Sequence, residues 1–267
     1  MRILSLNVWG GMLHAPLLDY LRRVDADIYC LQEVAQAPAA ETEWLTYRDG
    51  TVELQQRARL YDEIATVLPD HRGGFYPTAR GELLDGDTPC PQFFGLATFV
   101  RDTIPVVGSV LDFIHGSYSA DGFGDHPRSR NAHGLRIYAH ETDVHVSVVH
   151  LHGLRDPQGK HDTPARQAQA IKLKALIEAL CQDGDRLVVC GDFNLLPESD
   201  TFGVLASLGL RDLVTTGGFS GTRTGYYTKA GRFADYMLVN DAVDVQRFEV
   251  VATPEVSDHC ALLLDLA

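Results

Sequence analysis

The sequence predicts an α/β protein whose β-sheets are mixed rather than purely parallel. Apolar runs typical of strands alternate with runs that have helical spacing, and the middle of the chain is almost entirely strand-like. Strands that follow one another without a helix between them favour antiparallel meanders. With 267 residues, of which 45% are hydrophobic, the chain can bury one sizeable core, so we predict a single domain over residues 1–267.

The first third of the chain is expected to alternate between strands and helices. A strand is predicted around residues 2–7 and another around 27–31, with an amphipathic helix from about 16 to 24 between them. Residues 52–68 are predicted to contain a second helix, because residues recur at helical spacing there: Ala58, Tyr61, Ile64, Ala65 and Leu68.

The middle of the chain has the pattern of consecutive strands separated by turns. The strand-like runs are residues 95–100, 106–111, 134–138 and 144–149. Residues 73–94 and 113–133 fit no regular element. Irregular stretches of this length are typical of functional or mobile loops.

A third helix is predicted to begin at Thr163-Pro164, because threonine is a good N-cap and proline is favoured at the first helical position. Gly184 is expected to mark the exit from this helix toward a strand around Leu187. The stripe expected to share one face of the helix consists of Ala168, Ile171, Ala175, Leu176, Ala179 and Leu180.

The charge balance limits the classes of substrate. The chain has 36 acidic and 23 basic residues, which gives a formal net charge of −13. Because non-specific nucleic-acid binding depends mostly on Lys and Arg, this charge disfavours a long duplex as the main substrate without excluding it.

The cysteines and the hydropathy pattern indicate a cytoplasmic protein. The five cysteines are an odd number without a Cys-x-x-Cys pair, so we expect free thiols rather than disulfides or a zinc site. No apolar stretch reaches the roughly 20 residues that a membrane helix needs. The first residues lead directly into a strand rather than into a signal-peptide segment. The oligomeric state stays open.

The most informative motif lies at the end of the strand-like run 186–191, which is followed by Asp192 and Asn194. Positions two apart on a strand face the same way, so the two side chains should project together from the end of the sheet. A carboxylate can act as a base or a metal ligand, and a neighbouring amide can hold an oxygen by hydrogen bonds.

Further polar residues lie at the ends of other apolar runs. They are Asn7, Glu33, the strand-borne His150 and His152, Asp235, Asp258 and His259. Each residue type is common where strands end, so a single one would carry little weight. Their joint occurrence is the evidence for a catalytic site.

In chain order these motifs resemble the signatures of the endonuclease/exonuclease/phosphatase superfamily: an Asn after the first strand, Gln-Glu after the second, a strand-borne His, Gly-Asp-Phe-Asn, Asp-Tyr and Ser-Asp-His. The resemblance extends from Asn7 to His259. It implies a four-layer α/β sandwich, in which two packed β-sheets are flanked by helices. It also implies a phosphoester hydrolase that depends on Mg²⁺ or Mn²⁺.

We predict that Glu33 is the primary metal ligand, with Asn7 close by on the metal or on a phosphate oxygen. The resemblance implies that Asp258 is a second acidic residue beside the metal. Hard oxygen ligands of this kind suit Mg²⁺ or Mn²⁺. In the DNA-repair members, the residue two positions after the first Asn is an acidic metal ligand, whereas Trp9 occupies that position here. This difference favours a single-metal hydrolase of a smaller diester over a repair nuclease.

The resemblance also implies the catalytic roles. Asp192 would activate the attacking water, and Asn194 would hold the phosphate. His259, oriented by Asp235, would stabilise the phosphoryl oxygens or transfer a proton.

Histidine and arginine side chains complete the predicted site. His150 is favoured as the phosphate-contacting histidine, and its neighbour His152 on the same strand face stays an alternative. Paired guanidinium contacts could clamp a phosphate. The candidates for this role are Arg128, Arg130, Arg223 and Arg232, of which Arg128 and Arg232 are the two that we predict to bind substrate.

We therefore predict a metal-dependent phosphodiesterase that attacks a small or lipid-like phosphodiester directly with water. One alternative is a Mg²⁺-dependent endonuclease or exonuclease acting on DNA or RNA. An alternative of another class is a catalytically silent binding module on the same fold, because a fold alone does not determine function.

Overall fold

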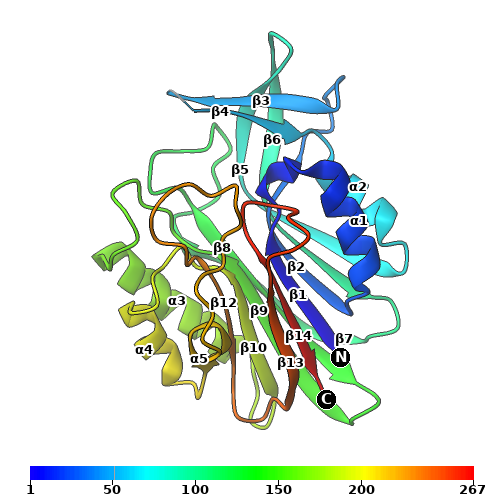
Figure 1. Cartoon of the computed structure of the whole chain (residues 1–267), viewed down its shortest axis with the longest axis vertical. Helices are drawn as coiled ribbons and strands as arrows, with labels where there is room; N and C mark the ends of the chain where they lie inside the picture. The colour runs from blue at the N-terminus through cyan, green and yellow to red at the C-terminus, as the bar shows by residue number, and fades with distance from the viewer. Residues whose placement is uncertain (51) are drawn as a thin grey trace.

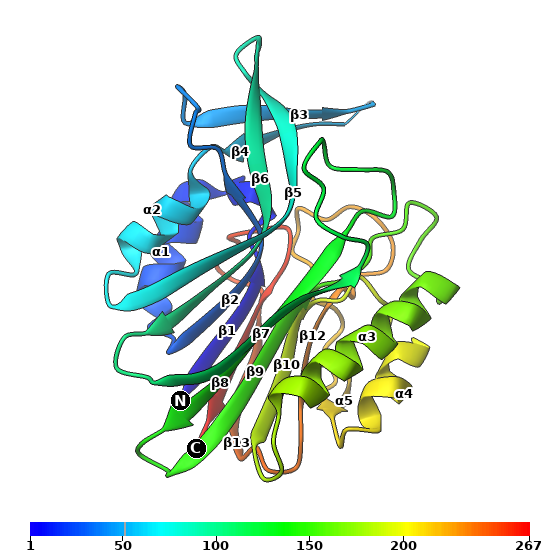
Figure 2. The ribbon, with the colours of Figure 1, turned by 180° about the vertical axis from the view of Figure 1, so that it is seen from behind.

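The protein is a four-layer α/β sandwich, as the resemblance implied. The computed structural model describes residues 1–50 and 52–267. Within these residues, two mixed β-sheets of eight and six strands pack against each other, and helices cover their outer faces (Figure 1, Figure 2).

The larger sheet joins both ends of the chain. Across this sheet the described strands follow the order β13 (Val245–Val251), β14 (Ala261–Leu266), β1 (Arg2–Asn7), β2 (Ile28–Gln36), β6 (Thr88–Arg101), β5 (His71–Asp85), β3 (Trp44–Asp49) and β4 (Val52–Arg57). Strands β1 and β2 are parallel, so both carboxyl ends lie at one edge of the sheet. The antiparallel β14 begins at this same edge.

The smaller sheet has the same arrangement. Its described strands follow the order β11 (Arg211–Asp212), β12 (Asp235–Val239), β10 (Arg186–Asp192), β9 (Val144–His152), β8 (Arg130–Ala139) and β7 (Val106–His115). Strands β9 and β10 are parallel and end together, while the antiparallel β12 begins where β10 ends.

Helices α1 (His14–Val24) and α2 (Leu60–Val67) cover the larger sheet, and α3 (Pro164–Leu180), α4 (Asp200–Ala206) and α5 (Leu213–Thr216) cover the smaller one (Figure 2). A short 3₁₀ turn, η1 (Trp9–Gly11), follows β1. The α-helices therefore cover the outer faces of the sheets, and only this short turn directly follows the carboxyl end of β1.

The two sheets share a continuous apolar core. Ile3 and Ile28 of the larger sheet lie in one buried cluster with Val148 and Val188 of the smaller sheet. Burying such side chains contributes roughly 1.5–3 kcal/mol each, so this interface holds the two sets of strand ends in a fixed relation.

The structure confirms the predicted start of α3 and corrects its buried face. The side chain of Thr163 accepts a hydrogen bond from the Arg166 backbone N–H at 3.3 Å. Leu176 is buried as expected, but Ile171 is 56% exposed. The buried face instead includes Arg166 and Gln169, because their side chains hydrogen-bond to backbone groups of the loop after β9. A pattern built on apolar residues alone misses these positions.

The predicted helix over residues 52–68 is wrong in its first half. Residues 52–57 form β4, which pairs with β3, and only α2 is helical. Helical spacing in the sequence began at Ala58, so it carried no information about the residues before it. Pairing with a neighbouring strand determined their structure.

The expected irregular stretch 73–94 is also corrected, because it forms most of the β5–β6 hairpin. Asp85 pairs with Thr88 across a two-residue turn that contains Gly86 at φ 61°. Pro77 lies at a register shift of the hairpin, where a missing N–H is tolerated. The stretch 113–133 is irregular only between β7 and β8.

The five cysteines are free thiols, as expected, and Cys181 alone among them is not fully buried. In the part of the chain that the structure describes, no helix is long and apolar enough to cross a membrane.

Candidate active site

The polar motif residues converge where the central strands of both sheets end. Asp192 closes β10, and it pairs in register with His152 of β9 and with Asp235 of β12. Asn7 closes β1 in the facing sheet, and its side-chain Nδ2 donates to Asp192 Oδ2 at 3.0 Å. This hydrogen bond joins the two sheets at the site.

A buried carboxylate orients the imidazole of His259. His259 Nδ1 lies 2.9 Å from both Asp235 carboxylate oxygens, and both residues are buried. Burial lowers the pKa of His259 and raises the pKa of Asp235, because a charge is poorly solvated there. The other ring nitrogen, Nε2, lies 3.7 Å from Asp192 Oδ2 and 3.7 Å from Asp258 Oδ1. It therefore faces the centre of the cluster.

Asp192 is held by hydrogen bonds to both of its oxygens. Besides the bond from Asn7, its Oδ1 accepts the Asn194 backbone N–H at 2.9 Å. Asn194 adopts a left-handed conformation at φ 56°, which turns the chain sharply after β10. Such conformations persist where surrounding contacts enforce them and are frequent at active sites.

The turn after β10 packs tightly against the loop after β9. Gly153 donates its backbone N–H to Asp192 O at 2.6 Å, and an added Cβ at Gly153 would lie 2.3 Å from Phe193 O. A larger residue cannot enter without displacing backbone that positions the Asp192 carboxylate.

Gly153→Ala is therefore expected to lower the free energy of unfolding by about 1–3 kcal/mol, because it overpacks a backbone contact. Urea unfolding followed by circular dichroism measures this change. The matched control is Gly203→Ala in α4, where nothing lies within 4 Å of the added Cβ. There alanine should raise stability by up to about 1 kcal/mol through its higher helix propensity. An unchanged unfolding midpoint for Gly153→Ala would contradict this close approach.

Glu33 lies where β2 departs from regular pairing with β6, at a register shift between Leu31 and Val34, and its φ is 58°. Burial raises the pKa of the Glu33 carboxyl, the hydrogen bond with Asn7 lowers it, and the charge of Asp192 raises it further. The Glu33 carboxyl is thus buried beside a second carboxylate, Asp192, and the charges of Arg155 and Arg130 offset part of their repulsion.

The donor set fits a hard divalent cation. Asp258 Oδ1 is buried and has no hydrogen-bond partner among the described residues, and burial raises the pKa of this carboxyl. Ligand atoms of Glu33, His152 and Asp192 lie within 4.8 Å of one another. Carboxylate and amide oxygens are ligands that Mg²⁺ and Mn²⁺ favour. Of the residues expected to hold such an ion, Glu33 belongs to this group and Asp258 offers the oxygen without a partner.

The structure does not place His150 in this cluster. His150 Nε2 lies 2.7 Å from Thr98 Oγ1, in a buried network that also contains His133. His152 Nε2 instead lies 3.6 Å from Asp192 Oδ2 and 3.8 Å from Glu33 Oε1. The two histidines share one face of β9, but His150 lies one strand repeat deeper between the sheets. We therefore transfer the proposed phosphate contact from His150 to His152.

The two arginines predicted to bind substrate have other partners. Arg128 donates to Tyr47 Oη at 3.0 Å and to Asp49 Oδ2 at 2.9 Å, which ties the loop after β7 to β3. Arg232 donates to the backbone carbonyls of Arg223 and Thr224. Neither guanidinium contacts the cluster, and both have structural partners instead.

The other two arginine candidates lie beside the cluster. Arg130 Nε donates to Gly153 O at 2.8 Å. Burial lowers the pKa of Arg130 to about 10, although the charges of Glu33 and Asp192 favour its protonated form. Arg223 pairs with Asp258 Oδ2 at 2.7 Å. Both are closer to the predicted chemistry than Arg128.

Lys160 was not predicted as a site residue. Its ammonium donates to Gly231 O at 3.0 Å and also to Phe233 O, and burial lowers its pKa to about 8. The only signal in the sequence was a basic residue in the segment that follows a motif strand. Its position depends on how two loops far apart in the chain meet.

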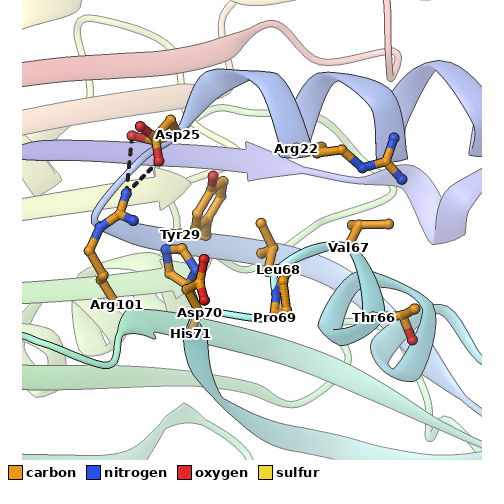
Figure 3. Close-up of a pocket in the computed structure, with 10 residues that line it drawn as sticks. All are labelled: Arg22, Asp25, Tyr29, Thr66, Val67, Leu68, Pro69, Asp70, His71 and Arg101. Atoms are coloured by element: carbon orange, nitrogen blue, oxygen red, sulfur yellow. Dashed lines mark hydrogen bonds and ion pairs between the residues drawn. The ribbon is translucent and has the colours of Figure 1, made fainter.

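A pocket of about 300 Å³ lies away from this cluster, at the amino end of β2 (Figure 3). Its walls include Tyr29, His71 and Arg101, and Arg101 pairs with Asp25 at 2.6 Å. None of the motif residues lines it. Asn7 and Asp192 close β1 and β10 at the carboxyl ends of the parallel strands, away from this pocket.

Comparison with solved structures shows proteins of the same fold. A mannosyl-6-phosphatase from Bacteroides thetaiotaomicron has a similar structure, with a TM-score of 0.69, 16% identity, and coverage of 100% of this chain and 99% of that one. The human Nocturnin catalytic domain with bound sulfate matches with a TM-score of 0.62, 18% identity, and coverage of 100% and 94%. At these identities the likeness shows a shared fold.

A family protein from Beutenbergia cavernae matches with a TM-score of 0.70 and 16% identity, over 100% of this chain and 71% of that one. No curated protein matches this chain. The model of the Endonuclease/Exonuclease/phosphatase family matches residues 4–259, which include the motif residues from Asn7 to His259. The chain belongs to the endonuclease/exonuclease/phosphatase family.

Proposed function

We propose that this protein is a divalent-metal-dependent hydrolase that cleaves a small phosphodiester by direct attack of water. The observation that carries the proposal is the buried His259–Asp235 pair, whose free ring nitrogen faces Asp192 at 3.7 Å. This arrangement joins an oriented carboxylate and an oriented imidazole at one point. General acid–base groups placed in this way contribute typically 10²–10⁴-fold, about 3–5 kcal/mol each.

Asp192 is the proposed proton acceptor for the attacking water. Its carboxylate is fixed by Asn7 and by the Asn194 backbone N–H, so it needs no reorganisation when water approaches. The Asn194 side chain lies against the Gly153 carbonyl at 3.4 Å and can turn toward a phosphate oxygen. Because water attacks the phosphorus directly in this proposal, no covalent intermediate is formed.

His259 is the proposed partner of the phosphoryl oxygens. With its Nδ1–H donated to Asp235, the ring presents Nε2 to the substrate. When Nε2 takes up a proton, the imidazolium can donate a hydrogen bond to a phosphoryl oxygen. The Asp235 carboxylate then stabilises the positive ring. His152 and Arg130 lie on the other side of Asp192, where they can hold a second oxygen.

A bound Mg²⁺ or Mn²⁺ would neutralise charge on the phosphoryl oxygens as a Lewis acid. Glu33, Asp258 and Asn7 are proposed to hold it. The net charge of −13 supports a small substrate over a long duplex. The similar Bacteroides thetaiotaomicron protein is named a mannosyl-6-phosphatase, and this name also describes an enzyme with a small phosphorylated substrate.

Hydrolysis of bis(p-nitrophenyl) phosphate tests the proposal beside its monoester analogue, p-nitrophenyl phosphate, with Mg²⁺, with Mn²⁺ and with EDTA. We expect turnover that requires the metal and is faster on the diester. Faster turnover of the monoester would make the protein a phosphatase. If neither ester is cleaved, short single-stranded oligonucleotides test the nuclease alternative. Failure there as well would favour a silent binding module and overturn the proposal.

A further inference from the structure

We propose that Lys160, Arg223 and Tyr227 form a subsite beside the catalytic histidine that binds a second anionic group of the substrate. A phosphate or a carboxylate has the required chemistry. The inference rests on the proposed function and narrows its substrate class. The substrate would be a small phosphoester that carries a further negative charge.

The backbone fixes Arg223 next to the catalytic centre. Arg223 forms an isolated antiparallel bridge with His259, and the flanking Cys260 N–H donates to Thr222 O at 2.8 Å. Arg232 holds the same segment by donating to the carbonyl of Arg223. The position of Arg223 is therefore tied to that of the imidazole.

The guanidinium of Arg223 has bonding capacity left over. It is 9% exposed, and its ion pair with Asp258 Oδ2 spans 2.7 Å. Its Nε is buried and has no hydrogen-bond partner within the described residues. A guanidinium has five N–H donors, so one ion pair leaves several of them for another acceptor. Buried donors without partners are rare in folded proteins and favour a bound ligand.

Lys160 brings a second cation to the same place. Its Nζ lies 5.5 Å from the centre of the Tyr227 ring, and the Arg223 guanidinium carbon lies 4.4 Å from it. The two identified acceptors of the Lys160 ammonium are neutral backbone carbonyls, of Gly231 and Phe233. Because an ammonium has three donors, one remains available.

The energetic argument concerns the balance of charge. Two like charges that share one aromatic ring repel each other, and both have lost most of their hydration. The Tyr227 ring attracts each cation by roughly 0.5–2 kcal/mol, which does not replace a counter-ion. Asp258 pairs with Arg223 and lies 3.7 Å from His259 Nε2, and within the described chain no carboxylate lies at ion-pair distance from the Lys160 ammonium. The charges of Asp192 and Asp235 act on Lys160 only from farther away. An anionic group of the substrate would supply a counter-charge in direct contact.

A purely structural role for Lys160 makes a different prediction. Lys160 joins the loop after β9 to the loop before β12, so its loss would loosen both loops. That effect would weaken the binding of every ligand equally. If Lys160 belongs to a subsite, its loss should weaken the binding of ligands that carry a second anionic group more than the binding of other ligands. Comparing two ligands therefore separates the two roles.

The experiment is calorimetric titration in EDTA with n-butyl phosphate and with butane-1,4-diyl bisphosphate. We expect the wild-type protein to bind the bisphosphate at least about tenfold more tightly, as an added charge-assisted contact implies. Lys160→Met should remove most of this preference, and Lys160→Arg should keep it. The control is Lys174→Met on α3, whose lysine pairs with Glu178, and it should behave as wild type.

Equal affinities of the wild-type protein for the two ligands would overturn the inference. The inference would also be overturned if Lys160→Met lowered the affinity for both ligands by the same factor. If Lys160→Met does not fold, Lys160→Gln removes the charge while keeping a donor, and the same comparison applies. Binding in EDTA requires no turnover, so an inactive protein would refute the proposed function without deciding the subsite.

Discussion

Asp192→Asn is expected to lower kcat for a phosphodiester by about 10²–10⁴-fold, because it removes the proposed proton acceptor for the attacking water. The substitution keeps the shape of the side chain. Its Oδ1 can still accept the Asn194 N–H, but the new side-chain NH₂ group faces the NH₂ group of Asn7, and two donors cannot form a hydrogen bond with each other. His259→Ala should cause a loss of similar size, since it removes the group that faces the phosphoryl oxygens. Initial rates at saturating Mn²⁺ measure both changes.

Stability should respond differently to the loss of Asp192. The charge of Asp192 raises the pKa of Glu33, which it repels, and also raises the pKa of Arg223, which it attracts. Because these two effects oppose each other, Asp192→Asn should change the Tm by only a few degrees, about 1 kcal/mol or less in stability. The matched control is Asp185→Asn, which lies just before the opposite end of the same strand and breaks an ion pair with Arg136 at 2.8 Å.

For Asp185→Asn we expect a lower Tm with an unchanged kcat. Wild-type turnover by both Asp192→Asn and His259→Ala would show that the catalytic centre lies elsewhere. A large loss of Tm in Asp192→Asn would show instead that the carboxylate has a structural role.

Glu33→Gln is expected to raise the metal concentration needed for half-maximal activity by about 10²-fold or more. Losing a residue that only hydrogen-bonds to a metal ligand typically lowers metal affinity by about 10–100-fold, and losing the charge of a ligand itself should lower it further. At saturating Mn²⁺ most of kcat should return. Titration of activity against Mn²⁺, with calorimetry of Mn²⁺ binding, measures the change. The control is Glu178→Gln on α3, whose carboxylate pairs with Lys174 far from the cluster.

We also expect the effect of Glu33→Gln on stability to depend on pH. The folded-state pKa of Glu33 is raised above its ordinary value of 4.5, chiefly by burial. Such a carboxyl destabilises the folded state once the pH exceeds the unfolded pKa. In EDTA at neutral pH, Glu33→Gln should therefore have a higher Tm than wild type, and the difference should shrink below pH 4.5. A metal requirement equal to that of wild type would remove Glu33 from the ligand set.

The sequence predicted the identity of the polar residues at the strand ends because that information is local. An apolar run that ends in Asp192, or one that ends in Asn7, places its last side chain at the edge of a sheet whatever the strand order. The same holds for the N-cap at Thr163, whose hydroxyl needs only the next turn of its own chain.

The choice between His150 and His152 could not be made from the sequence. Both face the same side of β9, and the period of a strand does not say where the strand meets its neighbours. Register decided the matter, because Cys190 lies beside His150 and Asp192 lies beside His152. Register is a property of the assembled sheet.

Residues 52–57 were wrongly included in a predicted helix, and residues 73–94 fitted no regular element in the sequence. Both segments form strands because a neighbouring strand, β3 or β6, supplies hydrogen bonds to their backbone. Strand formation depends on such partners more than on intrinsic propensity.

The sequence by itself determined which polar residue types end the central strands and that the fold is α/β with mixed sheets, because strand-end motifs and hydrophobic periods are local properties of the chain. The four-layer sandwich was implied by the family motifs. Only the tertiary structure decided which cations lie beside them. Arg128 pairs with Asp49, whereas Arg223 and Lys160 both lie near the Tyr227 ring. These side chains come from loops joined through long-range packing, and the direction of a flexible side chain depends on partners that the sequence alone does not place.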